Sequence, residues 1–514
     1  MILKTFKANT QAILLLVFAF SINRHFANYG VEPMDTFVLY GGGYKVMNGL
    51  VPFKDYWLTT GPLMDYLSSL FFMINGVNWS SYIFHSSSMN ALAAIFSYFF
   101  LIKLGLNKNY SFVYALGFSI LMYPPVGVPF VDHHSTILTV FAFYLVVIAQ
   151  KTRNFSYLIF VPLFLILAFL CKQTPASYGI ISIFFIILMM FFNTDKKKEF
   201  FVAGILGVFI AIIFLFAFFY FSQIPFNEFF TQYINHGSSI GLFRFLNFKV
   251  SVIGILSQYK FILLQLFFLI FLLLKSFKSK SDIVLISFPI IILTILLLFH
   301  QIFTMNENFI FFIIPILAGI NHVYCDKIIL TKKFFKYLII LFCFFSVIKY
   351  HVRFNEKRKF HSLEYVDLKK AVDAKKSDES LKGLKWITKE YSDNPIIEIE
   401  AINDAKQIIL RENKKFILLT NYLFLNSIIN KDEYSPNQWY HPEVSFPIPG
   451  NKNFLNYKEF FLKKIKNNNI EKIFSVGSDV EDLIFLTFDK KCFSKIKIGY
   501  FLFEYQLKTS ISNC

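Results

Sequence analysis

The sequence predicts an α-helical polytopic membrane protein with about eleven transmembrane helices, juxtamembrane helices in the first outer loop and a small C-terminal α/β domain. Hydrophobic residues make up 55% of the chain, and the mean hydropathy is +0.53. Charged residues make up only 16%, whereas about 25% is usual in soluble domains. The excess of hydrophobic side chains is therefore expected to face lipid.

Acidic residues divide the chain into two regions. Residues 1–350 contain 11 of the 33 acids, and the remaining 164 residues contain 22. A transmembrane domain is therefore expected over 1–350, and a soluble α/β domain over 351–514.

The transmembrane helices are predicted from long apolar runs, several of them shorter than the ~20 residues that cross a bilayer. The runs are centred near residues 16, 91, 118, 142, 164, 185, 211, 267, 293, 316 and 342. The first run resembles a signal peptide, but no small-x-small cleavage site follows it, and we interpret it as a retained helix.

The orientation follows from the basic residues of alternate loops. Loops 1–8, 103–110, 150–156, 193–199, 275–282 and 325–336 contain 16 Lys and Arg in 50 residues. The other loops, 23–79, 123–135, 172–176, 223–260 and 301–308, contain 7 in 121 residues. The positive-inside rule then predicts a cytoplasmic N-terminus and a periplasmic or extracellular C-terminal domain, in a bacterial inner membrane.

The apolar segment Pro62–Asn75 is the main test of this predicted orientation. Its 14 residues would cover about 21 Å as a helix, too little for a span. It is expected to lie in the interface or to re-enter, because a true span would reverse the side of every later loop.

The net charge of +18 and the five cysteines exclude some classes of function. Lys residues of the first 350 positions cluster between apolar runs, which is typical of membrane orientation and not of nucleic-acid binding. The cysteines have no CxxC or other ligand spacing, so they indicate no site.

The tail is expected to begin with a charged linker over 351–395. Beyond it, Lys415–Thr420, Lys472–Gly477 and Tyr500–Tyr505 are predicted strands, and Tyr457–Lys466 is a predicted amphipathic helix. The stretch Ser435–Pro447 has aromatic residues that either stack on a sugar or simply pack a loop.

Candidate chemical groups collect in the outer loops. Asp35 follows the first helix by about a dozen residues, and it precedes Gly49-Leu-Val-Pro-Phe-Lys-Asp55-Tyr56 and Gly61-Pro-Leu-Met-Asp-Tyr66. This order resembles the first outer loop of the membrane-embedded glycosyltransferases of the C superfamily, such as the protein O-mannosyltransferase and aminoarabinose transferase families. The resemblance covers residues 1 to about 175. Many members have an acidic dipeptide where this chain has Met34-Asp35.

The resemblance implies inverting transfer of a sugar from a polyprenyl-phosphate carrier to an acceptor on a lipid, glycan or protein at the outer membrane face. Asp35 is the candidate general base, and Asp55 of the same loop a substrate-binding candidate. The leaving phosphate calls for a cation. Lys172 is isolated in lysine-poor outer loops, so it is either that cation or a snorkelling side chain, and Arg244, Lys249 and Lys260 are weaker candidates.

The tripeptide Asp132-His133-His134 lies where family members commonly have a second acidic residue. Asp132 is a catalytic candidate that either orients the acceptor or pairs with a phosphate-binding cation, and both histidines are substrate-binding candidates. The alternatives are a helix N-cap by Asp132 or a divalent metal site, although adjacent residues rarely face one ion. We therefore expect no metal and no cofactor. His236, a further substrate-binding candidate, His300 and Glu307 are outer-face groups or simply polar helix ends.

Other classes of membrane protein fit less well. A transporter or flippase of lipid-linked sugars should have ionisable residues within its spans and matched broken helices, and few charges lie in mid-span here. A glycan polymerase is expected to have its largest loop late in the chain, whereas the distinctive loop here is the first.

Overall fold

The computed structural model describes residues 2–246, 250–276, 281–304, 310–328, 332–431, 434–477 and 480–507. The chain forms two compact units. The first is built from Met1–Ala27, Ser86–Ala217 and Phe248–Phe360, and the second from Asn28–His85, Phe218–Asn247 and His361–Cys514. The domain boundary predicted after residue 350 stays a prediction. Lys249 and Glu307 lie outside the described residues.

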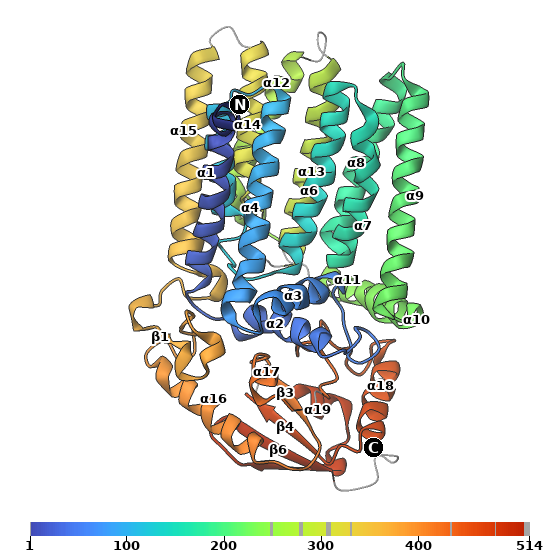
Figure 1. The fold of residues 1–514 in the computed structure, drawn as a ribbon, viewed down its shortest axis with the longest axis vertical. Helices are drawn as coiled ribbons and strands as arrows, with labels where there is room; N and C mark the ends of the chain where they lie inside the picture. Colours follow the sequence, from blue (N-terminus) through green and yellow to red (C-terminus); the bar gives the residue numbers. More distant parts are fainter. Residues whose placement is uncertain are drawn as a thin grey trace. The chain divides into compact units, whose positions relative to one another are not determined.

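The first unit is a bundle of apolar helices (Figure 1). Among the described residues, eight helices are long and apolar enough to cross a membrane, judged by length and composition. They are α1 (Ile2–Ala27), α4 (Trp79–Leu104), α6 (Val131–Thr152), α8 (Gln173–Asn193), α9 (Lys197–Ser222), α12 (Val252–Ser276), α13 (Ser281–Thr304) and α15 (Lys332–Tyr350), which continues into a π-helical turn, η3 (His351–Glu356).

Three further helices coincide with the remaining predicted runs. They are α5 (Lys108–Leu121), α14 (Ile313–Ile328) and α7 (Val161–Cys171), which extends the 3₁₀ turn η1 (Phe155–Phe160). Each of the eleven predicted centres thus falls inside a helix, and the polytopic helical class is confirmed. These three are shorter than the eight, as expected for runs that are below bilayer length.

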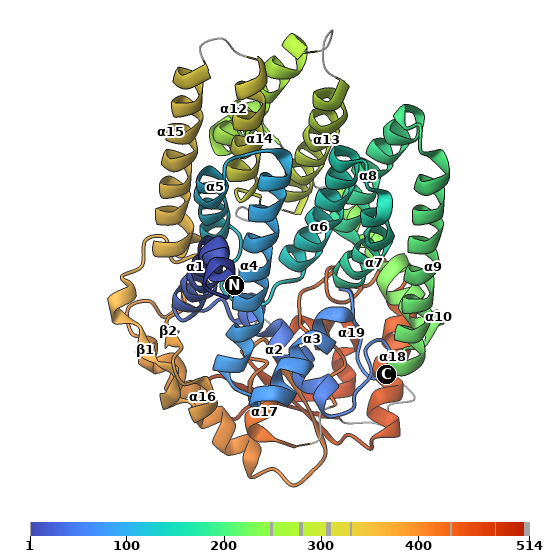
Figure 2. The same ribbon diagram turned by 45° about the horizontal axis from the view of Figure 1, so that its top comes forward.

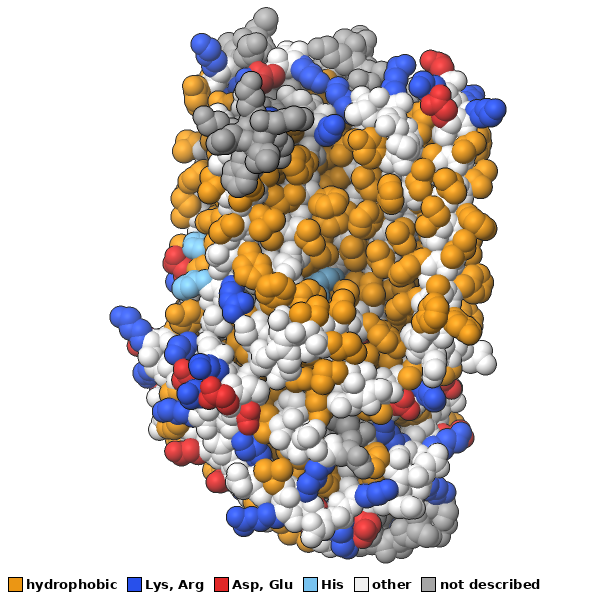
Figure 3. All heavy atoms as spheres, viewed as in Figure 1, with side chains coloured by type: hydrophobic (Ala, Val, Ile, Leu, Met, Phe, Trp, Pro, Cys, Tyr) orange, Lys and Arg blue, Asp and Glu red, His pale blue; other side chains and the backbone are white. Residues whose placement is uncertain are grey.

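The surface of the helices explains their composition. Ile205, Phe209 and Phe216 of α9 are 67%, 59% and 73% exposed. On the face drawn in Figure 3, hydrophobic side chains cover the helices, and charged side chains gather at helix ends. Such apolar surface is stable in lipid and not in water, so the protein is an integral membrane protein.

The second unit contains most of both predicted long outer loops, over residues 28–79 and 223–247, together with the tail from residue 361 onward. Its first helices are α2 (Pro33–Met47) and α3 (Leu63–Asn75), and the later loop forms α10 (Phe226–Phe229), the π-helical turn η2 (Phe230–His236) and α11 (Gly237–Leu246). A Cβ atom on Gly43 would lie 2.6 Å from the Cβ atom of Ser68, so glycine allows α2 and α3 to pack closely. As predicted, α3 is too short for a span.

The tail is an α/β domain with a four-stranded sheet in the order β3-β4-β6-β5. The strands are β3 (Phe416–Thr420), β4 (Lys472–Val476), β5 (Phe493–Lys497) and β6 (Leu502–Leu507). β3 and β4 are parallel with Phe416 opposite Lys472, whereas β6 is antiparallel to both β4 and β5. The helices are α16 (Pro395–Leu410), α17 (Leu425–Ile429), α18 (Phe454–Asn467) and α19 (Asp482–Thr487).

Most predicted elements of the tail are present. The three predicted strands correspond to β3, β4 and β6, and the predicted amphipathic helix lies within α18, whose Tyr457 and Phe461 are buried in the core. Strand β5 and helices α16, α17 and α19 were not predicted. The predicted linker contains short 3₁₀ turns and a two-residue ladder between β1 (Val372–Asp373) and β2 (Lys385–Trp386).

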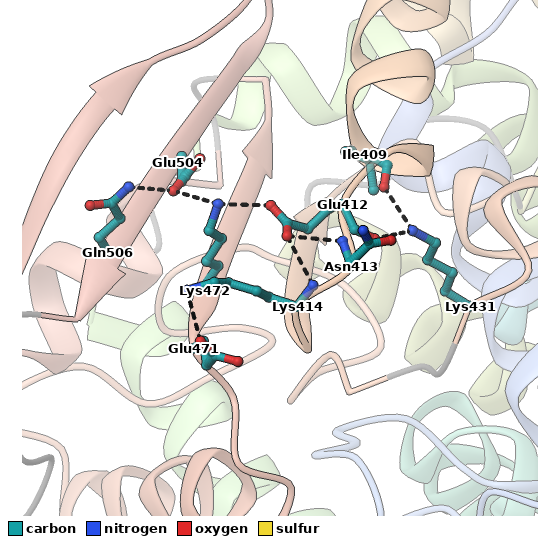
Figure 4. A network of polar contacts seen from close by, with 9 residues as sticks. All are labelled: Ile409, Glu412, Asn413, Lys414, Lys431, Glu471, Lys472, Glu504 and Gln506. Carbon is teal, nitrogen blue, oxygen red and sulfur yellow. Dashed lines mark hydrogen bonds and ion pairs between the residues drawn. The ribbon is translucent and has the colours of Figure 1, made fainter.

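Two lysines, Lys472 of the sheet and Lys431 after α17, bind groups at the C-terminal end of α16 (Figure 4). Lys472 of β4 lies 2.7 Å from a carboxylate oxygen of Glu412 and 3.1 Å from one of Glu504. Lys431 donates to the backbone carbonyl groups of Ile409 and Leu410 at 3.1 and 2.9 Å. A cation at a helix C-terminus satisfies carbonyl groups that have no partner within the helix, so these contacts are structural.

Candidate active site

Three charged or polar side chains of the first unit meet at Asp132. Its Oδ2 atom lies 2.7 Å from Lys172 Nζ, and its Oδ1 atom lies 2.9 Å from His300 Nε2. The three residues come from the first turn of α6, the junction of α7 and α8, and the last turns of α13. The junction of α7 and α8 and the end of α13 therefore each place a side chain against the Asp132 carboxylate of α6.

The backbone around Lys172 explains how this side chain reaches Asp132. Lys172 has an extended conformation, with φ −160° and ψ 139°, between the last residue of α7 and the first residue of α8. Its carbonyl oxygen accepts a hydrogen bond of 3.2 Å from Ser135 Oγ on α6. This hydrogen bond connects the junction of α7 and α8 to α6, the helix that carries Asp132.

Asp132 does not cap α6. Phe130 occupies the N-cap position without a side-chain hydrogen bond, and Asp132 lies in the first turn, where the helix dipole favours a negative charge. The N-cap alternative is therefore wrong. The other alternative from the sequence, a carboxylate paired with a cation, agrees with the contact to Lys172.

Burial differs among the three members of this cluster. The side chains of Asp132 and His300 are 4% and 0% exposed, whereas that of Lys172 is 18% exposed. A buried carboxylate is costly unless both oxygens have partners, and here each oxygen has one. The ammonium group of Lys172 is held in position by Asp132, and the Lys172 side chain is the most exposed of the three.

The two histidines that follow Asp132 support the preceding turn. His134 Nδ1 is hydrogen-bonded to the hydroxyl group of Tyr123. The ring of His133 packs against Tyr123 and Phe130, with centroids 5.1 and 5.6 Å apart. Neither histidine makes a metal cluster with Asp132, because the described residues contain no group of three or more His, Cys, Asp and Glu suited to a metal ion.

A buried arginine stabilises the same turn and was not predicted. Arg358 donates to the carbonyl groups of Pro124 and Pro125 at 2.8 and 3.3 Å and to that of Val126 at 3.1 Å. Arg358 is 0% exposed. It lies in the charged segment after the last predicted span, and nothing in its sequence neighbourhood distinguishes it from a solvated linker residue.

The first outer loop belongs to the second unit. Asp35 lies in the first turn of α2 and is half-buried. The Asp55 carboxylate accepts a hydrogen bond of 2.7 Å from the backbone N–H of Val51, and its backbone carbonyl accepts one from Lys464. Asp55 therefore closes a turn of the loop, which is a structural role for this predicted substrate-binding residue.

A second buried carboxylate, Asp65 of α3, joins the first loop to the tail. Tyr56 Oη donates to Asp65 Oδ2 at 2.6 Å, and Gln438 Nε2 donates to Asp65 Oδ1 at 2.5 Å. Lys45 Nζ donates to the carbonyl oxygen of Asn437 at 2.6 Å. Burial raises the pKa of Asp65 to about 7, despite the opposing effects of Tyr56 and Lys45.

Residues of the aromatic stretch Ser435–Pro447 take part in this network. Gln438 is bonded to Asp65, Tyr440 is buried, and the backbone N–H of Trp57 donates to the carbonyl group of Pro436 at 2.7 Å. The loop therefore packs against the first outer loop within the second unit. Of its residues, His441 remains exposed.

The last two predicted substrate-binding residues lie in the later outer loop. His236 is buried at the end of η2, with its ring 5.9 Å from that of Trp57, and burial lowers the pKa of His236 to about 4. Arg244 is half-buried on α11. Within its own unit, the structure thus brings Asp132 together with Lys172, and it places Asp35, Asp55, His236 and Arg244 in the other unit.

Comparisons with known proteins identify the fold. No protein-family model and no curated protein matches this chain. The crystal structure of ArnT from Cupriavidus metallidurans bound to undecaprenyl phosphate has 10% identity and a TM-score of 0.51, over 98% of this chain and 99% of that chain. Archaeal oligosaccharyltransferase AglB from Archaeoglobus fulgidus, in complex with an inhibitory peptide and a dolichol-phosphate, has 12% identity and a TM-score of 0.47, over 92% and 70%.

The similarity to ArnT confirms the fold expected from the first outer loop. The chain has the fold of ArnT, an aminoarabinose transferase. At 10% identity the comparison with ArnT establishes the architecture, and it does so over almost the full length of both chains.

Proposed function

We propose that this protein is an inverting glycosyltransferase that uses a sugar carried on polyprenyl phosphate and an acceptor at the outer face of a bacterial inner membrane. The observation that supports this most strongly is the fold, which is similar to ArnT over 98% of the chain. The structure of ArnT that it resembles contains undecaprenyl phosphate. A lipid carrier of the same chemical class is the natural donor for an enzyme whose candidate groups lie at the ends of apolar helices.

The reaction exchanges one bond at the anomeric carbon of the sugar. An acceptor hydroxyl or amine attacks this carbon from the face opposite the phosphate, the carbon–oxygen bond to the phosphate breaks, and the configuration inverts. Asp35 is the proposed general base that takes the acceptor proton, a contribution worth roughly 10²–10⁴ in rate. It lies half-buried in the first turn of α2.

The departing lipid phosphate gains negative charge, and Lys172 is the proposed cation that stabilises it. Its side chain is partly exposed, and its ammonium group is held by Asp132 at 2.7 Å. Asp132, which is held in turn by His300, is then a positioning residue and not a second base. A cation fixed before the substrate arrives stabilises the developing charge without reorganisation.

The orientation of the protein is also part of the proposal. Most of the two long loops and of the tail belongs to one compact unit, which agrees with the side that loop charges predict for all three. This grouping supports a non-cytoplasmic tail.

The function is tested by comparing lipid-linked and surface-linked sugars, by mass spectrometry, in cells with and without the protein. We expect its loss to cause one polyprenyl-phosphate sugar to accumulate and one sugar modification to disappear. The purified enzyme in proteoliposomes should then transfer that sugar with inversion, which NMR of the product can measure. Movement of the lipid-linked sugar across the bilayer without product would indicate a flippase instead.

The role of Asp35 is tested by Asp35→Asn in the same assay. We expect turnover to fall at least 100-fold while binding of the lipid donor is unchanged, because the amide cannot accept the proton. The matched control is Asp393→Asn, which changes a fully exposed carboxylate of the second unit. Turnover near the wild-type rate in Asp35→Asn would remove Asp35 as the base.

A further inference from the structure

Two lysines of the first unit converge on one aromatic ring of the helix surface. The ammonium groups of Lys260 on α12 and Lys349 on α15 lie 5.8 and 5.2 Å from the centroid of the Phe261 ring. Both lysines are exposed, and the two side chains interact with each other. Arg353, one helical turn beyond Lys349, adds a third positive charge that acts on Lys349.

The surface around these lysines is apolar and faces outward. On α12, Leu256 and Leu264 lie one turn on either side of Lys260 and are 54% and 40% exposed. On α15, Phe345 lies one turn before Lys349 and is 57% exposed. The two lysines therefore lie within two exposed apolar stripes, one on α12 and one on α15, that can contact lipid acyl chains.

Lys260 and Lys349 have no carboxylate counter-ion among the described residues. In the part of the chain that the structure describes, neither Lys260 nor Lys349 forms an ion pair with a carboxylate. The acidic residue near the end of the same helical stretch, Glu356, lies 3.5 Å from His351 Nε2. Two neighbouring ammonium groups repel each other, so an arrangement that holds them together favours an anion between them.

We propose that Lys260 and Lys349 bind the phosphate of a resident anionic phospholipid, whose acyl chains lie along the exposed stripes of α12 and α15. A phospholipid phosphate supplies the negative charge, and its two hydrocarbon chains match the apolar surface on either side. Basic residues near a membrane surface attract anionic lipids by roughly fivefold in affinity per residue. Lys260 lies two turns inside α12 and Lys349 lies two turns before the end of the stretch formed by α15 and η3, and long side chains can extend from such positions to the headgroup region.

This site is separate from the candidate active site. Lys260 and Lys349 belong to α12 and α15, whereas Asp132, Lys172 and His300 belong to α6, the α7–α8 junction and α13. The proposal does not depend on the glycosyltransferase function. It depends only on the protein being embedded in a bilayer.

The test is native mass spectrometry of the purified full-length protein in detergent, with titrations of phosphatidylglycerol, phosphatidylcholine and undecaprenyl phosphate. We expect wild-type protein to retain phosphatidylglycerol over phosphatidylcholine. The double variant Lys260→Gln/Lys349→Gln should lose roughly 10- to 30-fold in affinity for phosphatidylglycerol, and the double arginine variant should keep it. Thermal unfolding shows whether each variant is folded.

A matched control is available on the same helix. Lys275 lies near the opposite end of α12 with its ammonium group 4.9 Å from the centroid of the Phe271 ring, but without a second lysine on that ring among the described residues. Lys275→Gln should leave phosphatidylglycerol binding unchanged. Equal affinity in the folded double glutamine variant would overturn the proposal. So would a loss confined to undecaprenyl phosphate, because the lysines would then bind the lipid carrier instead.

Discussion

At the scale of single residues, the surroundings of Asp132 decide what its charge can do. Its two carboxylate oxygens are occupied by Lys172 and His300, and its side chain is 4% exposed. A base must meet the acceptor proton, and a buried carboxylate with both oxygens engaged is poorly placed for that. We therefore assign Asp132 to the positioning of Lys172, one of the two roles that the sequence left open.

Replacing either Asp132 or Lys172 should reveal the coupling between these two residues. Asp132→Asn leaves the ammonium group of Lys172 without its counter-ion, and Lys172→Met leaves the buried carboxylate with His300 alone. We expect each change to lower the free energy of unfolding by about 2–3 kcal/mol, because breaking one side of a buried pair leaves an uncompensated charge. The measurement is reversible denaturation in mixed micelles.

The double variant separates pairing from general damage. Asp132→Asn/Lys172→Met should cost much less than the sum of the single changes. The exposed pair Lys196 and Glu199, 3.3 Å apart, is the control and should contribute under about 0.5 kcal/mol. Strictly additive losses at Asp132 and Lys172 would contradict the assigned role.

At the scale of elements, α2 and α3 are connected to the tail by buried polar groups. Asp65 of α3 binds Tyr56 and Gln438, which are 9 and 373 residues away in the sequence. Such a network fixes one geometry because each unsatisfied group inside it would be costly. It explains why most of the aromatic loop of the tail is packed within the second unit, whereas His441 is exposed.

The raised pKa of Asp65 predicts a dependence of stability on pH. Burial raises this pKa from 3.8 to about 7, so the folded state holds a proton that the unfolded state releases. Its contribution to stability is complete below about pH 4 and is lost as the pH rises through 7. We expect the folded state to lose roughly 2–3 kcal/mol between pH 5 and pH 8 from this group.

Thermal unfolding of the full-length protein in detergent, followed from pH 5 to pH 8, measures this effect. In Asp65→Asn the fall in stability with rising pH should be smaller by the amount that Asp65 contributes. Asp393→Asn, at a fully exposed carboxylate, should keep the wild-type profile. Parallel profiles for wild type and Asp65→Asn would show that Asp65 does not carry a proton in this range.

At the scale of the whole molecule, the chain alternates between membrane helices and a second unit. The two long loops and the tail are far apart in sequence, and they fold together as one unit. This arrangement agrees with a topology in which the two loops and the tail lie on the same side of the membrane. The similarity to ArnT extends over 98% of this chain, so both units belong to that architecture.

Cysteine labelling tests the predicted orientation. Tyr365 of the tail is 94% exposed, and Lys196 lies in a predicted cytoplasmic loop with a side chain that is 51% exposed. A membrane-impermeant maleimide should label Tyr365→Cys in intact cells and Lys196→Cys only after permeabilisation.

The native cysteines of the described residues give little background for this labelling. Cys171, Cys325, Cys343 and Cys492 are buried. The reverse pattern of labelling would place the tail in the cytoplasm and would remove the proposed outer-face reaction.

Sequence alone determined the features of this protein that depend on short segments of the chain. Apolar runs identified all eleven helices of the bundle, and the short run at Pro62–Asn75 was correctly excluded as a span. Short buried strands and one amphipathic helix were predicted in the tail. These properties depend on composition and periodicity, which every short window of sequence reveals. The order of features in the first outer loop indicated the fold through its resemblance to a known family.

Tertiary structure alone decided which side chains meet. Asp132 and His300 are 168 residues apart, and only the packing of α6 against α8 and of α8 against α13 brings them within 2.9 Å. In the same way Arg358 became a buried donor to the Pro124 turn, and Asp55 and His134 became structural groups. The physical reason is that a contact depends on the rotation and height of whole helices, and a periodic apolar pattern leaves both undetermined.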